Sequence, residues 1–241
     1  MNVALLLSGG RGSRIGGEIP KQYLKINDKP VIFYCLRTLM RHEMIDAIQV
    51  VCEEEYRPLI LECVEEVSKE INIEGLDEEL FRGFSDPGEN RQLSILNGLK
   101  DIKKYASDAD TVLIHDAARP CVSEELITNC YGAMIGHEGV IPVLPMKDTV
   151  YLSGNGQKVS SLLDRSRVFS GQAPELFLIG KYYEANQELL PDRILDVHGS
   201  TEPAVLYGMD VVMIPGDEAN FKITTRADLE RFRNSFEDAD K

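Results

Sequence analysis

The chain has 241 residues, of which 43% are hydrophobic, which suits one well-buried α/β domain. Its formal net charge of -14 disfavours a nucleic-acid-binding protein, because affinity for phosphate backbones needs a basic surface. No apolar stretch approaches the roughly 18 residues that a membrane-spanning helix needs, so no membrane partner is expected. The five cysteines show no C-x-x-C spacing, which predicts buried free thiols and a cytoplasmic protein.

Strands and helices are expected to alternate along the first part of the chain. The apolar run 2–7 ends at glycine and predicts a buried parallel strand. Hydrophobic runs and periodicity predict further strands at 46–52, 80–84, 111–115 and 140–143. Amphipathic patterns predict helices at 30–41, 54–70, 89–103 and 123–135, the last with Ser123 as its N-cap.

The segment from about 147 to 172 breaks this rhythm. It alternates polar and apolar residues around Ser153-Gly154-Asn155-Gly156, and Asn-Gly is a hairpin turn signal. The α/β pattern then resumes with a helix at 179–189, a strand at 209–214 and a helix at 226–236. The pattern predicts a single doubly wound α/β domain over 1–241, with a mostly parallel sheet and a protruding β-arm at about 147–172.

A glycine-rich loop directly follows the first predicted strand. In an open parallel sheet, ligands bind at the carboxyl ends of the strands, and glycines let backbone N–H groups approach phosphate oxygens. The loop begins Ser8-Gly9-Gly10-Arg11-Gly12-Ser13-Arg14, and Lys21 follows a proline close by. The local surplus of positive charge fits a triphosphate, and Lys21 could neutralise charge on a transferring phosphoryl group. The alternatives are a surface loop whose glycines only make a turn and a solvated lysine.

Two familiar phosphate-binding loops do not match here. The dinucleotide fingerprint G-x-G-x-x-G would need glycine at position 15, where the chain has Ile15. The P-loop would need lysine after Gly17, where the chain has Glu18. A nicotinamide-dependent oxidoreductase, which shares the fold class, is therefore disfavoured.

A second polar segment, His115-Asp116-Ala117-Ala118-Arg119-Pro120, closes the predicted strand at 111–115. Asp116 stands where a carboxylate could hold Mg²⁺ against phosphates, and Arg119 could contact an anionic group. The alternative is a local ion pair between these two residues.

Two weaker signals lie elsewhere. Residues 88–94 begin a helix, where polar groups could recognise a nucleotide base, although a simple N-cap explains them almost as well. Residues 220–224 bring Lys222, which could return to the phosphates.

Taken together, six motifs resemble those of the 2-C-methyl-D-erythritol 4-phosphate cytidylyltransferases of the non-mevalonate isoprenoid pathway and of the related ribitol-5-phosphate cytidylyltransferases. They are GGRGSRIGGEIPKQYL, ENRQLSILNGL, HDAARP, PMKDTV, LDRS and GDEANFKIT, and they span nearly the whole chain. The resemblance implies a Rossmann-like nucleotidyltransferase fold and the transfer of CMP from CTP to a polyol phosphate, with Mg²⁺ as cofactor. It also implies a homodimer in which the arm reaches the partner subunit.

The resemblance assigns a role to each candidate residue. Arg14, Lys21 and Lys222 match catalytic positions, and Asp116 matches the metal ligand. The expected nucleotide-binding residues are Ser8, Gly9, Gly10, Gly12, Gly88, Glu89, Ser94 and Ala117. The expected acceptor-binding residues are Arg119, Thr149 and Arg165, the last across the dimer interface.

The departures from the family pattern fall at the acceptor end. The family commonly has Gln-Thr-Pro-Gln where this chain has Gln172-Ala173-Pro174-Glu175, and its Thr-Asp-Asp/Glu segment appears here within 198–203. Sites that hydrogen-bond a hydroxyl discriminate strongly between substrates, so these changes could redirect specificity. 2-C-methyl-D-erythritol 4-phosphate is the expected acceptor, and ribitol 5-phosphate or another polyol phosphate is the alternative. A catalytically silent nucleotide-binding regulator is a further alternative, against which Arg14, Lys21 and Asp116 argue.

Overall fold

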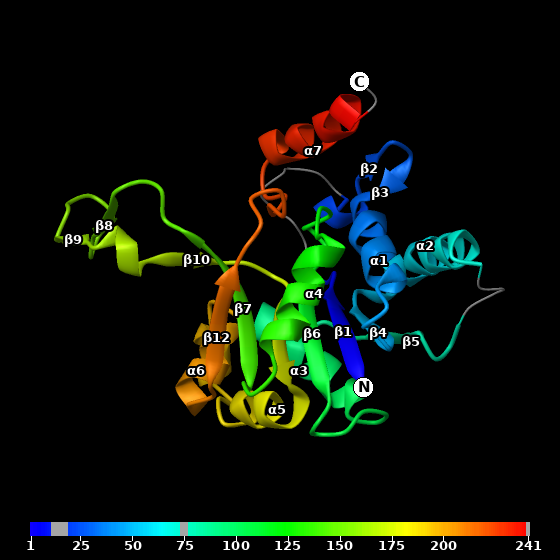
Figure 1. Cartoon of the computed structure of the whole chain (residues 1–241), viewed down its shortest axis with the longest axis horizontal. Coiled ribbons are helices and arrows are strands. Elements are labelled where there is room, and N and C mark those ends of the chain that lie inside the picture. Colours follow the sequence, from blue (N-terminus) through cyan, green and yellow to red (C-terminus); the bar gives the residue numbers. More distant parts are fainter. Residues whose placement is uncertain (11–18, 73–76, 240–241) are drawn as a thin grey trace.

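The computed structural model of the chain describes residues 1–10, 19–72 and 77–239. These residues form a central sheet with helices on both faces and a β-arm that projects from one end (Figure 1). None of the helices in these ranges combines the length and the apolar character that crossing a bilayer requires. The expected α/β class with a mostly parallel sheet is confirmed.

Strand β1 lies in the middle of the sheet, between β6 and β4, and is parallel to both. The strand order is β10-β7-β11-β6-β1-β4-β5, and β12 pairs with β7. Strand β11 was not predicted from the sequence; it lies antiparallel between β6 and β7. The strands of this sheet are β1 Asn2–Leu7, β4 Ala47–Val51, β5 Phe81–Ser85, β6 Thr111–Asp116, β7 Gly139–Pro145, β10 Phe169–Gly171, β11 Glu175–Leu178 and β12 Val211–Pro215.

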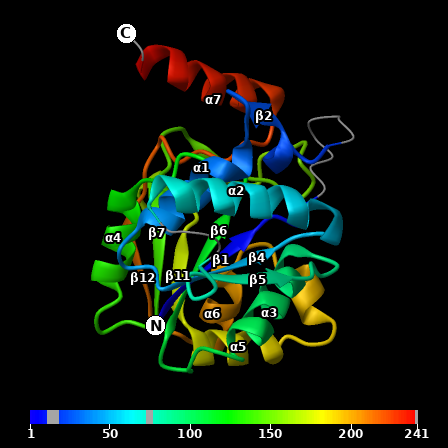
Figure 2. The same ribbon diagram turned by 90° about the vertical axis from the view of Figure 1, so that its right-hand side faces the viewer.

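Helices cover both faces of the sheet, with α1 and α2 on one side and α3, α5 and α6 on the other (Figure 2). The sequence of β1 is continuously apolar because both faces of this strand are buried. Ala4 and Leu6 pack in the core with α1, α2 and α4, whereas Val3 and Leu5 pack in the core with α3 and α5. The helices are α1 Val31–Arg41, α2 Arg57–Glu70, α3 Arg91–Ile102, α4 Glu124–Ala133, α5 Ile179–Gln187, α6 Thr201–Tyr207 and α7 Arg226–Ala239.

The chain reverses its direction of winding beside β1. It runs from β1 to β4 and β5 on one side, and returns to place β6 on the other side. The last residues of the two strands, Leu7 and Asp116, are register partners. The loop after β1 and the loop after β6 therefore meet at one edge of the sheet, which is where ligands bind in open α/β sheets.

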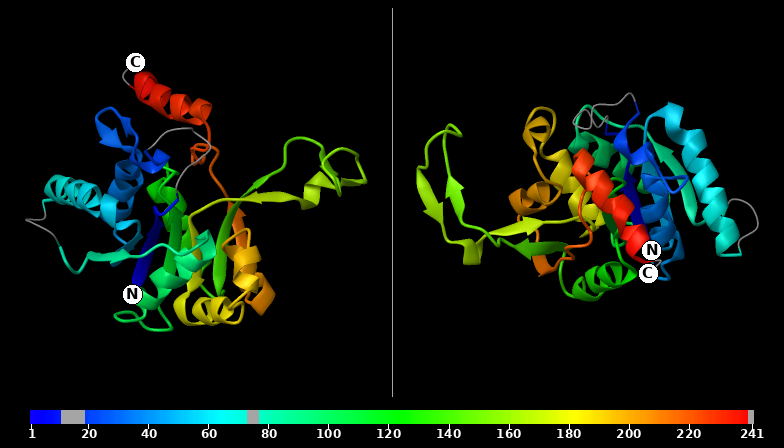
Figure 3. Two further views of the ribbon diagram at one scale, coloured as in Figure 1. Left: turned by 180° about the vertical axis from the view of Figure 1, so that it is seen from behind. Right: turned by 90° about the horizontal axis from the view of Figure 1, so that it is seen from above.

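The arm contains a ribbon of two antiparallel strands, β8 (Val150–Leu152) and β9 (Ser161–Leu163). The ribbon projects away from the helices and the central sheet in both views of Figure 3. The predicted Asn-Gly pair lies in the turn of this ribbon, where the Asn155 side chain accepts hydrogen bonds from the backbone N–H groups of Gln157 and Lys158. β10, within the range expected for the arm, pairs with β7 in the central sheet.

Two helices near the site differ from the prediction. Helix α3 begins at Arg91 and not at residue 89, because the Asn90 side chain caps it by accepting a hydrogen bond from Leu93 N at 2.8 Å. The short helix α6 was not predicted. In contrast, Ser123 caps α4 as expected, with its hydroxyl accepting from Leu126 N.

Candidate active site

A cleft of about 750 Å³ opens where the loops after β1 and β6 meet. Residues from widely separated parts of the sequence line it, including the start of α3 and the segment before α7. Eight of the predicted site residues line this cleft: Gly9, Gly10, Lys21, Gly88, Glu89, Ser94, Asp116 and Lys222. The structure thus brings the four separate polar segments together at one site.

The short 3₁₀ helix Lys21–Tyr23 holds the start of the glycine-rich loop that follows β1. The buried Gln22 side chain donates hydrogen bonds to the carbonyl oxygens of Ser8 and Gly10 at 2.7 and 2.8 Å. The Tyr23 hydroxyl donates to the Ser8 carbonyl oxygen at 3.0 Å and accepts from the Ser8 hydroxyl at 2.8 Å. These bonds fix the backbone that carries Lys21 relative to Gly9 and Gly10.

Gly88 lies in the loop between β5 and α3, where this loop approaches the backbone of α3. A Cβ atom at this position would stand 2.4 Å from the Leu93 Cβ atom and 2.9 Å from Ser94 N, so only glycine fits. Gly88 N donates a hydrogen bond to the Ser94 hydroxyl, which itself donates to the Asn90 carbonyl oxygen. Ser94 therefore shapes the loop that forms this wall of the cleft.

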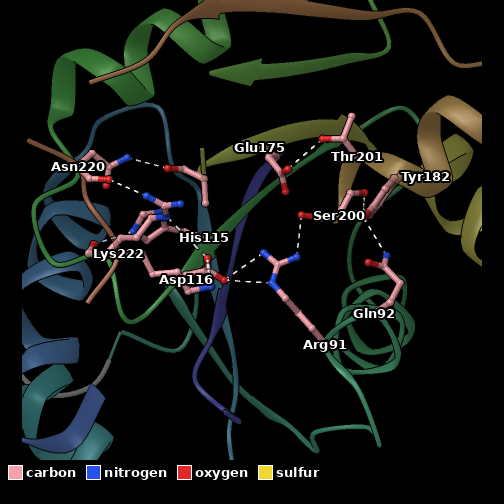
Figure 4. Close-up of polar contacts among 12 residues, drawn as sticks. Arg91, Gln92, His115, Asp116, Glu175, Tyr182, Ser200, Thr201, Asn220 and Lys222 are labelled. Carbon is pink, nitrogen blue, oxygen red and sulfur yellow. Dashed lines mark hydrogen bonds and ion pairs between the residues drawn. The ribbon is translucent and has the colours of Figure 1, made fainter. Parts of the chain in front are cut away.

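Asp116 lies among three cationic side chains at the end of β6 (Figure 4). Arg91 Nη2 lies 3.0 Å from Asp116 Oδ1, and Lys222 Nζ lies 2.9 Å from Asp116 Oδ2. Arg119 Nε lies 3.7 Å from Asp116 Oδ2. Burial opposes ionisation of Asp116, but the charges of Arg91, Lys222 and Arg119 outweigh it and hold its pKa well below the usual range. Asp116 is therefore an anion with an excess of positive charge around it.

Lys222 is held at the cleft by the segment that precedes α7. The Asn220 side chain donates to the Ala173 carbonyl oxygen at 2.7 Å, and Ile223 N donates to the Ala118 carbonyl oxygen at 2.8 Å. Asp228 Oδ2 accepts from the backbone N–H groups of residues 224 and 225, at 2.9 and 2.8 Å. The segment is tied to the sheet on one side and to the start of α7 on the other.

The sequence model for IspD, 2-C-methyl-D-erythritol 4-phosphate cytidylyltransferase, matches residues 2–235. The chain belongs to the IspD family. It is 36% identical to the 2-C-methyl-D-erythritol 4-phosphate cytidylyltransferase of Syntrophotalea carbinolica, covering 95% of this chain and 94% of that one. It is 28% identical to the ribitol-5-phosphate cytidylyltransferase of Streptococcus agalactiae, covering 97% and 94%. Its fold matches the 4-diphosphocytidyl-2C-methyl-D-erythritol synthase of Anaerococcus prevotii with a TM-score of 0.77 at 24% identity, over 98% of this chain and 95% of that one.

Several residues predicted for the site of this IspD-family chain do not line the cleft. Ser8 and Ala117 are buried behind it: the Ser8 hydroxyl is bonded to Tyr23, and Ala117 packs in the core because its N–H continues the pairing of β6 with β1. Arg119 donates to the Asn220 carbonyl oxygen at 2.7 Å and so supports the segment before Lys222. Arg14 and Gly12 lie outside the described residues.

Thr149 and Arg165 are exposed on the arm and take no part in lining the cleft of their own chain. Arg165 Nη1 donates to the Lys147 carbonyl oxygen at 2.8 Å, across the base of the ribbon. Both residues therefore lie away from the cleft that their own chain forms.

The structure adds residues to which the sequence analysis gave no role. Gln22 anchors the glycine loop, Arg91 binds Asp116, and Ala118 and Thr224 line the cleft. Gln22 and Arg91 each lie within a segment that was singled out, but nothing in the local pattern distinguishes an inward-facing glutamine or arginine from a solvated one.

Glu175, one of the departures from the family pattern, is buried at the start of β11. Its Oε1 accepts a hydrogen bond from the Thr201 hydroxyl at 2.9 Å, and its Oε2 has no hydrogen-bond partner. Burial raises the pKa of Glu175 to about 7, although Arg91 and Thr201 act in the opposite direction. Where the family commonly has glutamine, this chain therefore has a buried carboxyl group with a raised pKa close to Arg91.

Proposed function

We propose that this chain transfers CMP from CTP to a polyol phosphate and releases pyrophosphate. The observation that carries the proposal is the convergence of Gly9, Gly10, Lys21, Asp116 and Lys222 on one cleft in a member of a cytidylyltransferase family. 2-C-methyl-D-erythritol 4-phosphate is the first acceptor that we propose, after the family description. Ribitol 5-phosphate is the second, because a ribitol-5-phosphate cytidylyltransferase matches over the same length and Glu175 departs from the family pattern.

The reaction is a displacement at phosphorus. An oxygen of the acceptor phosphate forms a bond to the α-phosphorus of CTP, and the bond from that phosphorus to the bridging oxygen of pyrophosphate breaks. The acceptor phosphate is already a competent nucleophile, so no covalent enzyme intermediate is required. Catalysis then consists of positioning and charge stabilisation.

Lys21 and Lys222 supply the positive charge for this step in our proposal. Both line the cleft, and Gly9 and Gly10 leave backbone open beside them for phosphate oxygens. Arg14, outside the described residues, would join them. Gly88, Glu89 and Ser94 line the same cleft and are proposed to bind the cytidine.

We propose Mg²⁺ as the cofactor, with Asp116 as its protein ligand. Among the described residues, no group of three or more His, Cys, Asp or Glu side chains could hold a metal. The ionised carboxylate of Asp116 at the cleft nevertheless fits Mg²⁺, which binds through one or two carboxylates together with substrate phosphates and water. When bound, the ion would neutralise phosphate charge.

The single domain with its arm is proposed to function as a homodimer. The arm carries exposed apolar side chains, which are costly to leave in water and are typical of an interaction surface. They are Tyr151, Leu152, Val159, Leu162 and Phe169. We further infer a cytoplasmic location, because all five cysteines are free thiols.

Replacing Arg165 with alanine is expected to raise the KM for the acceptor about tenfold, the size of one lost charge-assisted hydrogen bond, and to leave CTP affinity unchanged. The reason is that Arg165 would contact the acceptor phosphate from the partner subunit. Steady-state kinetics with each substrate varied in turn measures the effect. Arg167→Ala, on the same exposed turn, is the matched control. Equal loss of affinity for both substrates would instead indicate a structural role for Arg165.

The test of the proposed function is pyrophosphate release with CTP and Mg²⁺, comparing 2-C-methyl-D-erythritol 4-phosphate with ribitol 5-phosphate. Preference for the first supports isoprenoid precursor synthesis. Preference for the second makes Glu175 and its neighbours candidates for specificity determinants. Turnover with neither acceptor, or equal turnover with UTP in place of CTP, contradicts the proposal.

A further inference from the structure

Arg91 lies in the first turn of α3 and binds two partners on different elements (Figure 4). Its Nε and Nη2 atoms donate to Asp116 Oδ1 at 3.2 and 3.0 Å. Its Nη1 atom donates to the Ser200 hydroxyl at 2.8 Å. One guanidinium group thus joins the end of β6 to the start of α6.

The second partner is itself held firmly. Ser200 is 1% exposed, and its carbonyl oxygen accepts from the Tyr182 hydroxyl at 2.6 Å. The Tyr182 hydroxyl in turn accepts from Gln92 Nε2 at 3.0 Å. The next residue, Thr201, donates to the buried Glu175. Ser200 therefore offers Arg91 a fixed acceptor, because β11, α3 and α5 all contribute to holding it.

The charges are consistent with this geometry. Burial disfavours the charged form of Arg91, but Asp116 and Glu175 outweigh it and raise the pKa of the guanidinium above its usual value. Arg91 occupies Oδ1 of Asp116, while Lys222 and Arg119 lie at Oδ2. Each carboxylate oxygen therefore has its own cationic neighbours.

We propose that Arg91 is a positioning residue, which sets the orientation of the Asp116 carboxylate and is itself held in place by Ser200. The proposal rests on the proposed function, in which Asp116 is the metal ligand. Arginine is required because its planar fork binds two acceptors at fixed angles, whereas lysine presents a single compact charge. Groups that orient a metal ligand typically change metal affinity or activity by 10–100-fold when they are altered.

The test compares CTP binding by calorimetry in EDTA and in Mg²⁺, for the wild type, Arg91→Lys and Ser200→Ala. In Arg91→Lys, the gain in CTP affinity that Mg²⁺ produces is expected to fall by about 10–100-fold, while CTP affinity in EDTA stays unchanged. Ser200→Ala is expected to act in the same direction with a smaller effect. The Mg²⁺-dependent gain in CTP affinity should fall no further in the double variant than in Arg91→Lys, because Arg91→Lys already lacks the Arg91–Ser200 hydrogen bond.

Arg37→Lys is the matched control, since Arg37 pairs with Glu70 on the surface at 2.6 Å, between α1 and α2. It should bind CTP as the wild type does in both conditions. Urea unfolding checks that every variant is folded.

Three outcomes overturn the proposal. The first is an unchanged Mg²⁺-dependent gain in CTP affinity in Arg91→Lys, and the second is an equal loss of CTP affinity in EDTA and in Mg²⁺ in that variant. The third is a wild type whose CTP affinity does not rise with Mg²⁺. Absence of wild-type pyrophosphate release contradicts the proposed function instead. The calorimetric comparison still decides the role of Arg91 in that case, because it requires no turnover.

Discussion

Replacing Lys21 with alanine is expected to lower kcat for CMP transfer by roughly 10²–10³, the scale of losing one strong transition-state contact. Lys21 lines the cleft together with Gly9, Gly10 and Lys222, where the triphosphate is proposed to bind. Charge that develops on the transferring phosphoryl group would lose its neighbouring cation. Steady-state kinetics with saturating acceptor measures the change.

The fold should survive this substitution, because the neighbours of Lys21 hold its backbone. Gln22 and Tyr23 are buried and bonded to the first loop. Lys25→Ala is the matched control, since Lys25 is exposed on the short strand Lys25–Ile26 that follows, and it should keep the wild-type kcat. A preserved kcat with a raised KM in Lys21→Ala would show that Lys21 only binds substrate.

Glu175→Gln is expected to make the protein more stable near pH 8 and to change its stability little near pH 4. Burial raises the pKa of Glu175 to about 7, above the value of about 4.5 for an unperturbed glutamate. A raised folded-state pKa contributes stability that is fully present below pH 4.5 and is lost as the pH rises towards 7. Glutamine cannot ionise, so the variant avoids this loss. A difference of 2.5 pKa units corresponds to about 3 kcal/mol in the free energy of unfolding at most.

Urea unfolding of the wild type and the variant at several pH values measures this difference. The amide oxygen of glutamine can still accept the hydrogen bond from Thr201, so the contact with α6 is retained. Glu65→Gln is the control, because Glu65 is exposed on α2, and it should give the same difference from the wild type at every pH. A difference for Glu175→Gln that does not vary with pH would show that the pKa of Glu175 is the same in the folded and the unfolded protein, and so is not raised by burial.

The amino-acid sequence was sufficient to predict the elements whose signals are local. Each of these signals depends on residues that are close together in the sequence. They are the apolar run of β1, the amphipathic pattern of α1 and the Ser123 cap of α4. The loops that follow β1 and β6 could be assigned to one edge of the sheet, because ligands bind at the carboxyl ends of parallel strands. The family motifs then pointed to Lys21, Asp116 and Lys222, and all three line the cleft.

Strand β11 and helix α6 could not be predicted in this way. Glu175–Leu178 is a short segment, and it forms a strand because it pairs with β6 and β7, which lie far away in the sequence. Helix α6 is seven residues long and has no side-chain cap. Short elements of this kind obtain their stability from tertiary packing and carry little periodic signal.

By itself, the sequence determined the fold class, the glycine loops and most of the cations and carboxylates of the cleft, because residue type and local spacing carry that information. Only the tertiary structure decided which partner each charge meets. Arg91 and Asp116 are 25 positions apart, and Arg91 and Ser200 are 109 positions apart, so no local pattern relates them. The low pKa of Asp116 and the raised pKa of Glu175 follow from burial and from these long-range neighbours, which exist only once the chain has folded.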